Sequence, residues 1–148
     1  MAADAPAAKP AASAQPTIEQ VLAELRTDLQ TAHSDIIAKG LTLNASEAAK
    51  FWPLFEQYQA EQNVLIDGQL KATQAYADRY SRLTDADSLA YVNALLDRDE
   101  KIHTIRVKWL AKFQTVLSPG NAARVIHIER RLGLVTQLKL ASMIPLVR

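Results

Sequence analysis

Apolar positions recur at steps of three and four along most of the chain, a spacing typical of amphipathic helices. One such series runs from about 17 to 39, and a second, longer one runs from about 45 to 82. Further series cover about 85–117 and 119–143, and the last must end before Pro145. No segment shows the strict alternation that a strand would require. The pattern therefore predicts an all-α protein with four helices.

The apolar positions of the second and fourth segments can be read directly from the sequence. Gln62 and Gln69 interrupt the apolar stripe of segment 45–82, and Pro53 predicts a kink or a short leading turn. The apolar positions of segment 119–143 are Val125, Ile126, Ile128, Leu132, Val135 and Leu138. We expect these side chains to form the inward face of the last helix.

Each predicted helix begins at a residue that can cap it. Thr17 and Gln20 form a capping box for the first helix, and Gly40 supplies its stop. The three later connections share one arrangement, a leucine before a capping residue, and read LNASE at 43–47, LTDAD at 83–87 and LSPGN at 117–121. LSPGN is not a phosphate loop, because it lacks the lysine and the preceding strand of a P-loop. It is a helix start with Pro119 at the first helical position.

The predicted helix lengths indicate an elongated molecule. A helix of about 38 residues extends about 57 Å at 1.5 Å per residue, whereas a compact globule of this size has a radius of gyration near 15 Å. The long segments therefore predict an elongated antiparallel helical hairpin or bundle. Exposed lengths of apolar stripe would favour a homodimer.

Composition narrows the class of protein. The chain has 148 residues, of which 49% are hydrophobic, and this predicts one folded helical domain over 17–148. The net charge of +1 makes nucleic acid an unexpected partner. There is no cysteine, and no apolar run approaches the roughly 20 residues of a membrane span.

The first sixteen residues are rich in alanine and proline, and we expect them to be disordered. They look like the mature start left by signal-peptide cleavage, with a methionine added in front, which predicts a periplasmic protein. The alternative is an ordinary flexible tail of a cytosolic protein.

Two segments, LNASEAAKFWPLFEQYQAEQ at 43–62 and VLSPGNAARVIHIERRL at 116–132, resemble the paired LTxxQ motifs of the Spy/CpxP family of bacterial periplasmic stress proteins. Asn44 and Ser118 stand in place of the threonines, and Glu47 and Asn121 in place of the glutamines, so that capping is kept. The stretch FWPLFEQY and the tail IPLV suggest a divergent branch. The resemblance implies a cradle-like helical dimer that binds partly unfolded proteins or modulates an envelope stress sensor. One relative, the zinc-resistance-associated protein, also binds metal.

Candidate contact residues for such a client are aromatic or basic: Phe51, Trp52, Phe55, Tyr58, Arg124 and Arg131. At helical spacing, three of the aromatic residues are better explained as core, while Trp52 lies off their stripe and is the better surface contact. Solvated surface is the default interpretation of the arginines, and attraction for acidic clients is the alternative.

No catalytic or metal-binding pattern is present. The three histidines, His33, His103 and His127, lie on different predicted helices and form no i, i+4 pair, so we expect no metal and no cofactor. Serines and threonines near the connections are explained as helix starts, and the acidic run 97–100 as a charged surface. We therefore expect a protein that is not an enzyme.

Three functions follow as hypotheses. The first is an ATP-independent periplasmic chaperone of the Spy/CpxP type. The second is a regulatory partner of a sensor kinase's periplasmic domain, and the third is a zinc- or copper-responsive binding protein.

Overall fold

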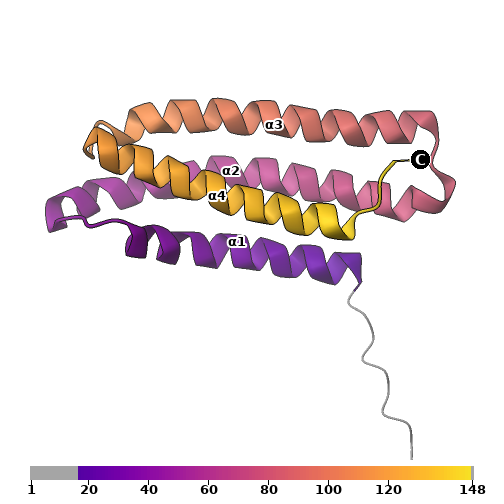
Figure 1. The fold of residues 1–148 in the computed structure, drawn as a ribbon, viewed down its shortest axis with the longest axis horizontal. Helices are drawn as coiled ribbons and strands as arrows, with labels where there is room; N and C mark the ends of the chain where they lie inside the picture. Colours follow the sequence, from indigo (N-terminus) through magenta and orange to yellow (C-terminus); the bar gives the residue numbers. More distant parts are fainter. Residues whose placement is uncertain (1–16, 148) are drawn as a thin grey trace, which may run out of the picture.

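The computed structural model describes residues 17–147, without the side chains of residues 28–31. Four helices make up this part of the chain: α1 (Ile18–Gly40), α2 (Ala45–Arg79), α3 (Asp85–Phe113) and α4 (Pro119–Met143). A single 3₁₀ turn, η1 (Tyr80–Arg82), follows α2, and no strand occurs among the described residues. The predicted all-α fold is confirmed (Figure 1). The expected disorder of residues 1–16 lies outside the described residues.

The predicted capping residues begin the helices. The side chains of Thr17, Asn44 and Thr84 each accept a hydrogen bond from the backbone N–H three residues later. In return, the backbone N–H of each donates to the side chain of that later residue, which completes a capping box. Ser118 accepts from the N–H of Asn121 at 3.2 Å. These bonds satisfy backbone donors that have no partner within the helix. The shared arrangement of the connections is thus a set of helix starts.

Three predicted helix ends differ from the structure. α2 ends at Arg79 and not at 82, because residues 80–82 form the 3₁₀ turn η1. α3 ends at Phe113 and not at 117, because Thr115 and Val116 donate their N–H groups to carbonyls three residues back, which tightens the chain into a turn. α1 ends at Gly40 and not at 39, and this glycine is not left-handed, since no described glycine has a positive φ. Gly40 instead permits a close approach of α4: a Cβ there would lie 2.7 Å from the Cδ1 of Ile128.

The helices form an elongated antiparallel bundle in which α1 and α3 lie at opposite corners, each beside α2 and α4 (Figure 1). The contact between α2 and α3 is by far the most extensive, and that between α3 and α4 is much thinner. The 35-residue α2 continues through Pro53 without interruption. Because neighbouring helices cover its apolar stripe, its length does not by itself require a second copy of the chain.

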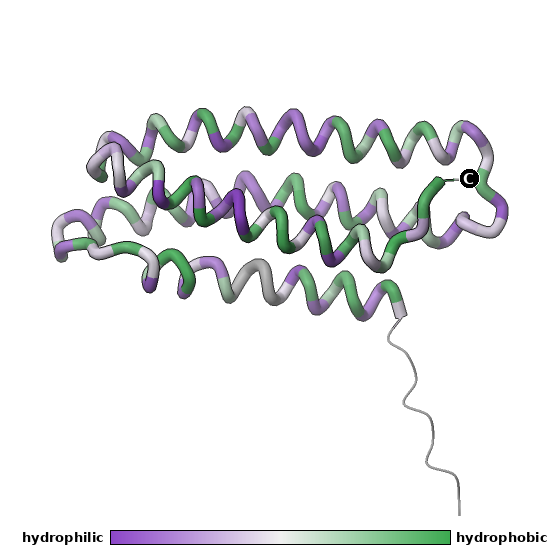
Figure 2. The backbone as a smooth tube through the Cα atoms, viewed as in Figure 1, coloured by the Kyte–Doolittle hydropathy of each residue, from purple (hydrophilic) through white to green (hydrophobic). Residues whose placement is uncertain are grey.

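Apolar side chains gather in two separate cores. The larger, the aromatic cluster, lies near the connections α1–α2 and α3–α4 and consists of Ile37, Leu41, Phe51, Phe55, Tyr58, Trp109, Phe113, Leu117, Ala122 and Val125. The smaller, the leucine cluster, lies toward the other end and consists of Leu22, Leu25, Leu70 and Leu140. Along every helix, hydrophobic and hydrophilic positions alternate with the helical repeat (Figure 2). The space between the two clusters is polar.

Candidate functional site

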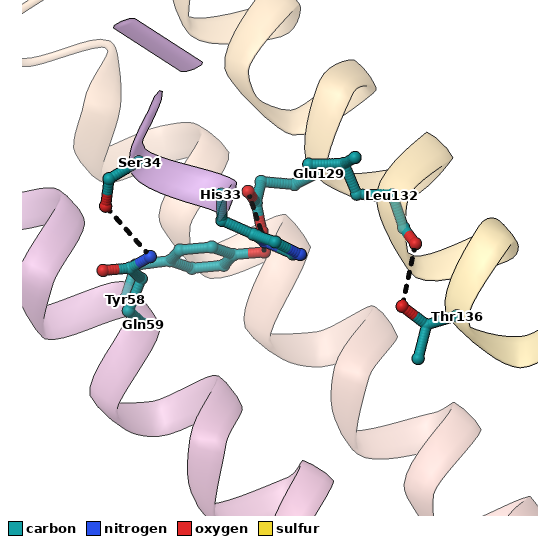
Figure 3. A network of polar contacts seen from close by, with 7 residues as sticks. All are labelled: His33, Ser34, Tyr58, Gln59, Glu129, Leu132 and Thr136. Atoms are coloured by element: carbon teal, nitrogen blue, oxygen red, sulfur yellow. Dashed lines mark hydrogen bonds and ion pairs between the residues drawn. The ribbon is translucent and has the colours of Figure 1, made fainter. Parts of the chain in front are cut away.

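A buried carboxylate occupies the middle of the bundle. Glu129 of α4 has no exposed surface, and its Oε1 lies 3.0 Å from Nδ1 of His33 on α1. The hydroxyl of Tyr58 on α2 donates to Oε2 of the same carboxylate at 3.2 Å (Figure 3). A carboxylate oxygen accepts hydrogen bonds, so the Nδ1–H tautomer of His33 fits this contact. Three helices are therefore joined through one acid.

α3, the remaining helix of the bundle, supplies a positive charge close to this carboxylate. Burial raises the pKa of Tyr58 well above its usual range, and the negative charge of Glu129 adds to this effect, whereas the guanidinium of Arg106 on α3 opposes it. Arg106 reaches across to α4 at Gly133, where a Cβ would lie 2.7 Å from its Nη2. Gly133 thus makes room for a guanidinium inside the bundle.

Amides extend this polar layer toward the leucine cluster. Gln69 of α2 and Gln137 of α4 exchange two hydrogen bonds, at 2.8 and 3.1 Å. Thr73 and Thr136 are also buried, and each donates its hydroxyl to the carbonyl four residues earlier in its own helix. These bonds keep the buried polar groups satisfied, which a low-dielectric interior requires.

A pocket of about 530 Å³ opens between α3 and α4, where these helices pack thinly. Its lining combines cationic and apolar side chains: Arg98, Asp99, Ile102, His103, Arg106, Val107, Leu110, Ile126, Arg130, Gly133, Leu134 and Gln137. Pockets of about 300–1,000 Å³ are the usual size for small-ligand sites. Because Arg106 and Gly133 belong to both features, the pocket adjoins the polar layer.

The predicted contact residues divide into two groups. Phe51, Phe55 and Tyr58 are completely buried in the aromatic cluster, and half-buried Trp52 packs against them. Arg124 and Arg131 are exposed on α4, outside the pocket lining, and Arg124 donates to the carbonyl of Gly40. The structure therefore brings the aromatic residues together with Trp109 and Phe113, but it does not place the two arginines among them.

The histidines have three different surroundings. His33 is buried against Glu129, His103 lines the pocket, and His127 is exposed. Within residues 17–147, no three histidine or acidic side chains gather in a way that could hold a metal ion.

The buried layer offers a substrate no room. The cavity beside His33 measures about 10 Å³, close to the minimum for a single water. In this arrangement Glu129 is enclosed by its partners, and its proximity to His33 serves to hold the helices together. The α3–α4 pocket, at about 530 Å³, lies within the size range of small-ligand sites.

Glu129 was not predicted from the sequence, because the apolar positions of α4 do not mark its buried face. The buried residues of α4 are Ala122, Val125, Glu129, Gly133, Thr136 and Leu140, while Val135 and Leu138 are exposed. The buried face of α4 does repeat at steps of three and four, but a glycine, a threonine and an acid occupy half of it, so a search for apolar positions does not find it. The interruptions at Gln62 and Gln69, both buried, were the other available signal.

Comparison with known proteins gave no match among family models, curated proteins or solved structures. None of the described helices is both long and apolar enough to span a membrane.

Proposed function

We propose that this protein is a non-enzymatic, ATP-independent periplasmic chaperone that holds segments of partly unfolded proteins along its α3–α4 surface. The observation that supports this function is the joining of exposed apolar side chains and arginines in one open seam. The resemblance of its helix starts to those of Spy/CpxP proteins points to the same function.

The seam is apolar beyond the limits of the pocket. Val107 and Leu134, which line the pocket, are 58% and 54% exposed. Leu138, at 70%, lies one turn after Leu134 and so extends the same face of α4. Exposed apolar side chains grouped in this way mark interaction surfaces more often than scattered ones do.

The chemistry of the seam fits a non-native segment with both apolar and acidic side chains. Arg98, Arg106 and Arg130 supply three positive charges, against the single acid Asp99 in the lining. Charge attraction speeds encounter, and a shallow apolar contact allows release without an energy source. A folded partner, which buries its apolar side chains, would find little to bind.

Two matched variants test the proposal. Leu134→Glu places a charge in the seam, and Val64→Glu places the same charge on α2, where Val64 is 71% exposed and lines none of the described pockets. We expect Leu134→Glu to reduce suppression of aggregation of a chemically denatured enzyme, measured by light scattering, several-fold more than Val64→Glu. Circular dichroism checks that both variants remain folded. Equal activity of the two variants, or no suppression by the native protein at several-fold molar excess, would contradict the proposal.

The homodimer and the periplasmic location remain predictions. Sedimentation velocity at several concentrations tests the dimer, and fractionation of the cells that naturally produce the chain tests the location. A pull-down that returned one sensor domain, and no set of unfolded clients, would favour the regulatory hypothesis.

A further inference from the structure

Two buried arginine nitrogens in the α3–α4 pocket have no partner. Among the side chains that the structure describes, the Nε atoms of Arg98 and Arg106 are the buried polar atoms without a hydrogen bond. Both arginines line the pocket. A buried donor that is left unsatisfied is costly, and in a native protein a bound water or ion is one explanation for it.

The acids near these arginines are engaged elsewhere. Asp99 accepts from Nη1 of Arg98 at 3.1 Å, but its carboxylate is 64% exposed and does not meet the buried Nε. The carboxylate of Glu129 is held by His33 and Tyr58. With Arg130 also in the lining, the pocket keeps an excess of positive charge. An anion would balance this excess, and a carboxylate pairs with a guanidinium through two parallel N–H···O hydrogen bonds.

The rest of the lining is apolar. Ile102 is buried, and Leu110 and Ile126 are half-buried on the two sides of the seam. Leu134 closes this apolar wall on α4. A small inorganic anion would leave the apolar wall in contact with water, whereas an alkyl chain would cover it.

We infer that the α3–α4 pocket is a binding site for an alkyl carboxylate, a fatty-acid-like molecule whose carboxylate meets Arg98 and Arg106 and whose chain lies against Ile102, Leu110 and Ile126. Arg130 at the surface adds attraction for the same charge. This inference does not depend on the proposed chaperone function, although both concern the same seam.

Titration calorimetry with laurate, below its critical micelle concentration, tests the site. We expect saturable binding of laurate, and binding at least about tenfold weaker for dodecanol, which lacks the charge, and for acetate, which lacks the chain. Arg98→Met removes a guanidinium from the pocket lining and should weaken laurate binding by about tenfold or more.

Neighbouring arginines on α4 provide the matched control. Arg130 lines the pocket and Arg131 does not, and both are exposed, so neither substitution disturbs the core. Arg130→Gln should weaken laurate binding several-fold, and Arg131→Gln should change it less than about twofold, since a distant exposed charge is screened. Methyl resonances of Leu110 and Ile126 should shift on titration, whereas those of Leu22 and Leu25 in the leucine cluster should not.

Three results would overturn the inference: equal affinity for laurate and dodecanol, equal effects of Arg130→Gln and Arg131→Gln, or absence of saturable laurate binding. Aggregation assays run without fatty acid separate this site from the proposed function. Suppression of aggregation without laurate binding would contradict the alkyl-carboxylate site and support the chaperone function. Laurate binding without suppression of aggregation would contradict the chaperone function and support the alkyl-carboxylate site.

Discussion

The same two helices, α3 and α4, meet in two different ways along their length. Near their connection, Trp109 and Phe113 of α3 share the fully buried aromatic cluster with Ala122 and Val125 of α4. Further along, an open pocket lies between the helices and is lined by Arg98 and Arg106 of α3 and by Gly133 and Gln137 of α4. How closely α3 and α4 pack therefore depends on the side chains that lie between them, and not on the course of the backbone alone.

The closed half of the seam is filled by aromatic rings. The ring of Phe113 lies 5.3 Å from that of Phe51, 5.9 Å from that of Tyr58 and 5.6 Å from that of Trp109, between centroids. Tilted and edge-to-face pairs of this kind add to the free energy gained by burial. The open half holds charged groups that must keep contact with water or with a ligand, so its side chains cannot close the gap.

The largest effect is expected in the closed half. Phe55→Ala removes a completely buried ring from the aromatic cluster and should lower the free energy of unfolding by about 3–5 kcal/mol. Urea denaturation followed by circular dichroism measures the loss. As a control, Val64→Ala at an exposed position should change stability by no more than about 0.5 kcal/mol. A loss below about 1 kcal/mol for Phe55→Ala would show that the aromatic cluster contributes little to the free energy of unfolding.

At the boundary between the two halves, the contacts of Glu129 contribute to stability. Glu129→Gln removes the charge that His33 and Tyr58 contact, and we expect it to cost about 2 kcal/mol, since hydrogen bonds to charged groups contribute more than neutral ones. A double-mutant cycle with Tyr58→Phe should show non-additivity, because the two changes remove one shared bond. Strict additivity of the two losses would contradict the bond between them.

Tyr58 makes the boundary sensitive to alkaline pH. Its pKa in the folded protein is raised by burial and by Glu129, while in the unfolded chain a tyrosine has a pKa of about 10. Between these values the unfolded chain loses a proton that the folded chain keeps, so stability falls as pH rises above about 10. The expected slope from this residue is about 1.4 kcal/mol per pH unit.

Tyr58→Phe isolates that contribution. Urea denaturation between about pH 9 and 11.5, around the unfolded pKa, should show a smaller decline of stability for Tyr58→Phe than for the native protein. The other tyrosines are present in both chains and cancel in the comparison. Identical pH profiles of the two chains would show that Tyr58 titrates in the folded protein as it does in the unfolded one.

The smallest effects on stability are expected at two helical glycines, of which Gly133 lines the open half. Gly68 on α2 has open space around it, so Gly68→Ala should raise stability by about 0.5–1 kcal/mol through helix propensity alone. Gly133→Ala should gain less, because its Cβ would lie 2.7 Å from Nη2 of Arg106 and the guanidinium must move. Thermal unfolding compares the two. An equal gain at both positions would mean that Arg106 does not need the space at Gly133.

Local features of the fold could be derived from the sequence because they depend on neighbouring residues. The helix starts at Thr17, Asn44, Thr84 and Ser118 follow from side chains that reach the backbone three residues later. Helix number and class follow from apolar periodicity. The burial of Phe51 and Phe55 likewise follows from their helical spacing.

The candidate site could not be derived in this way, because its residues come from four helices. Glu129 and His33 are separated by 96 positions, and nothing local marks them as partners. The buried stripe of α4 contains a glycine, a threonine and an acid, so apolar periodicity placed its inward face wrongly.

The sequence by itself determined where this protein is helical and where each helix begins, since those features arise from propensity, spacing and capping within a few residues. The tertiary structure alone decided that a carboxylate lies between two cores and that α3 and α4 part beyond the aromatic cluster. The physical reason is that burial and charge pairing depend on which helix faces meet, and only the packing of all four helices sets that.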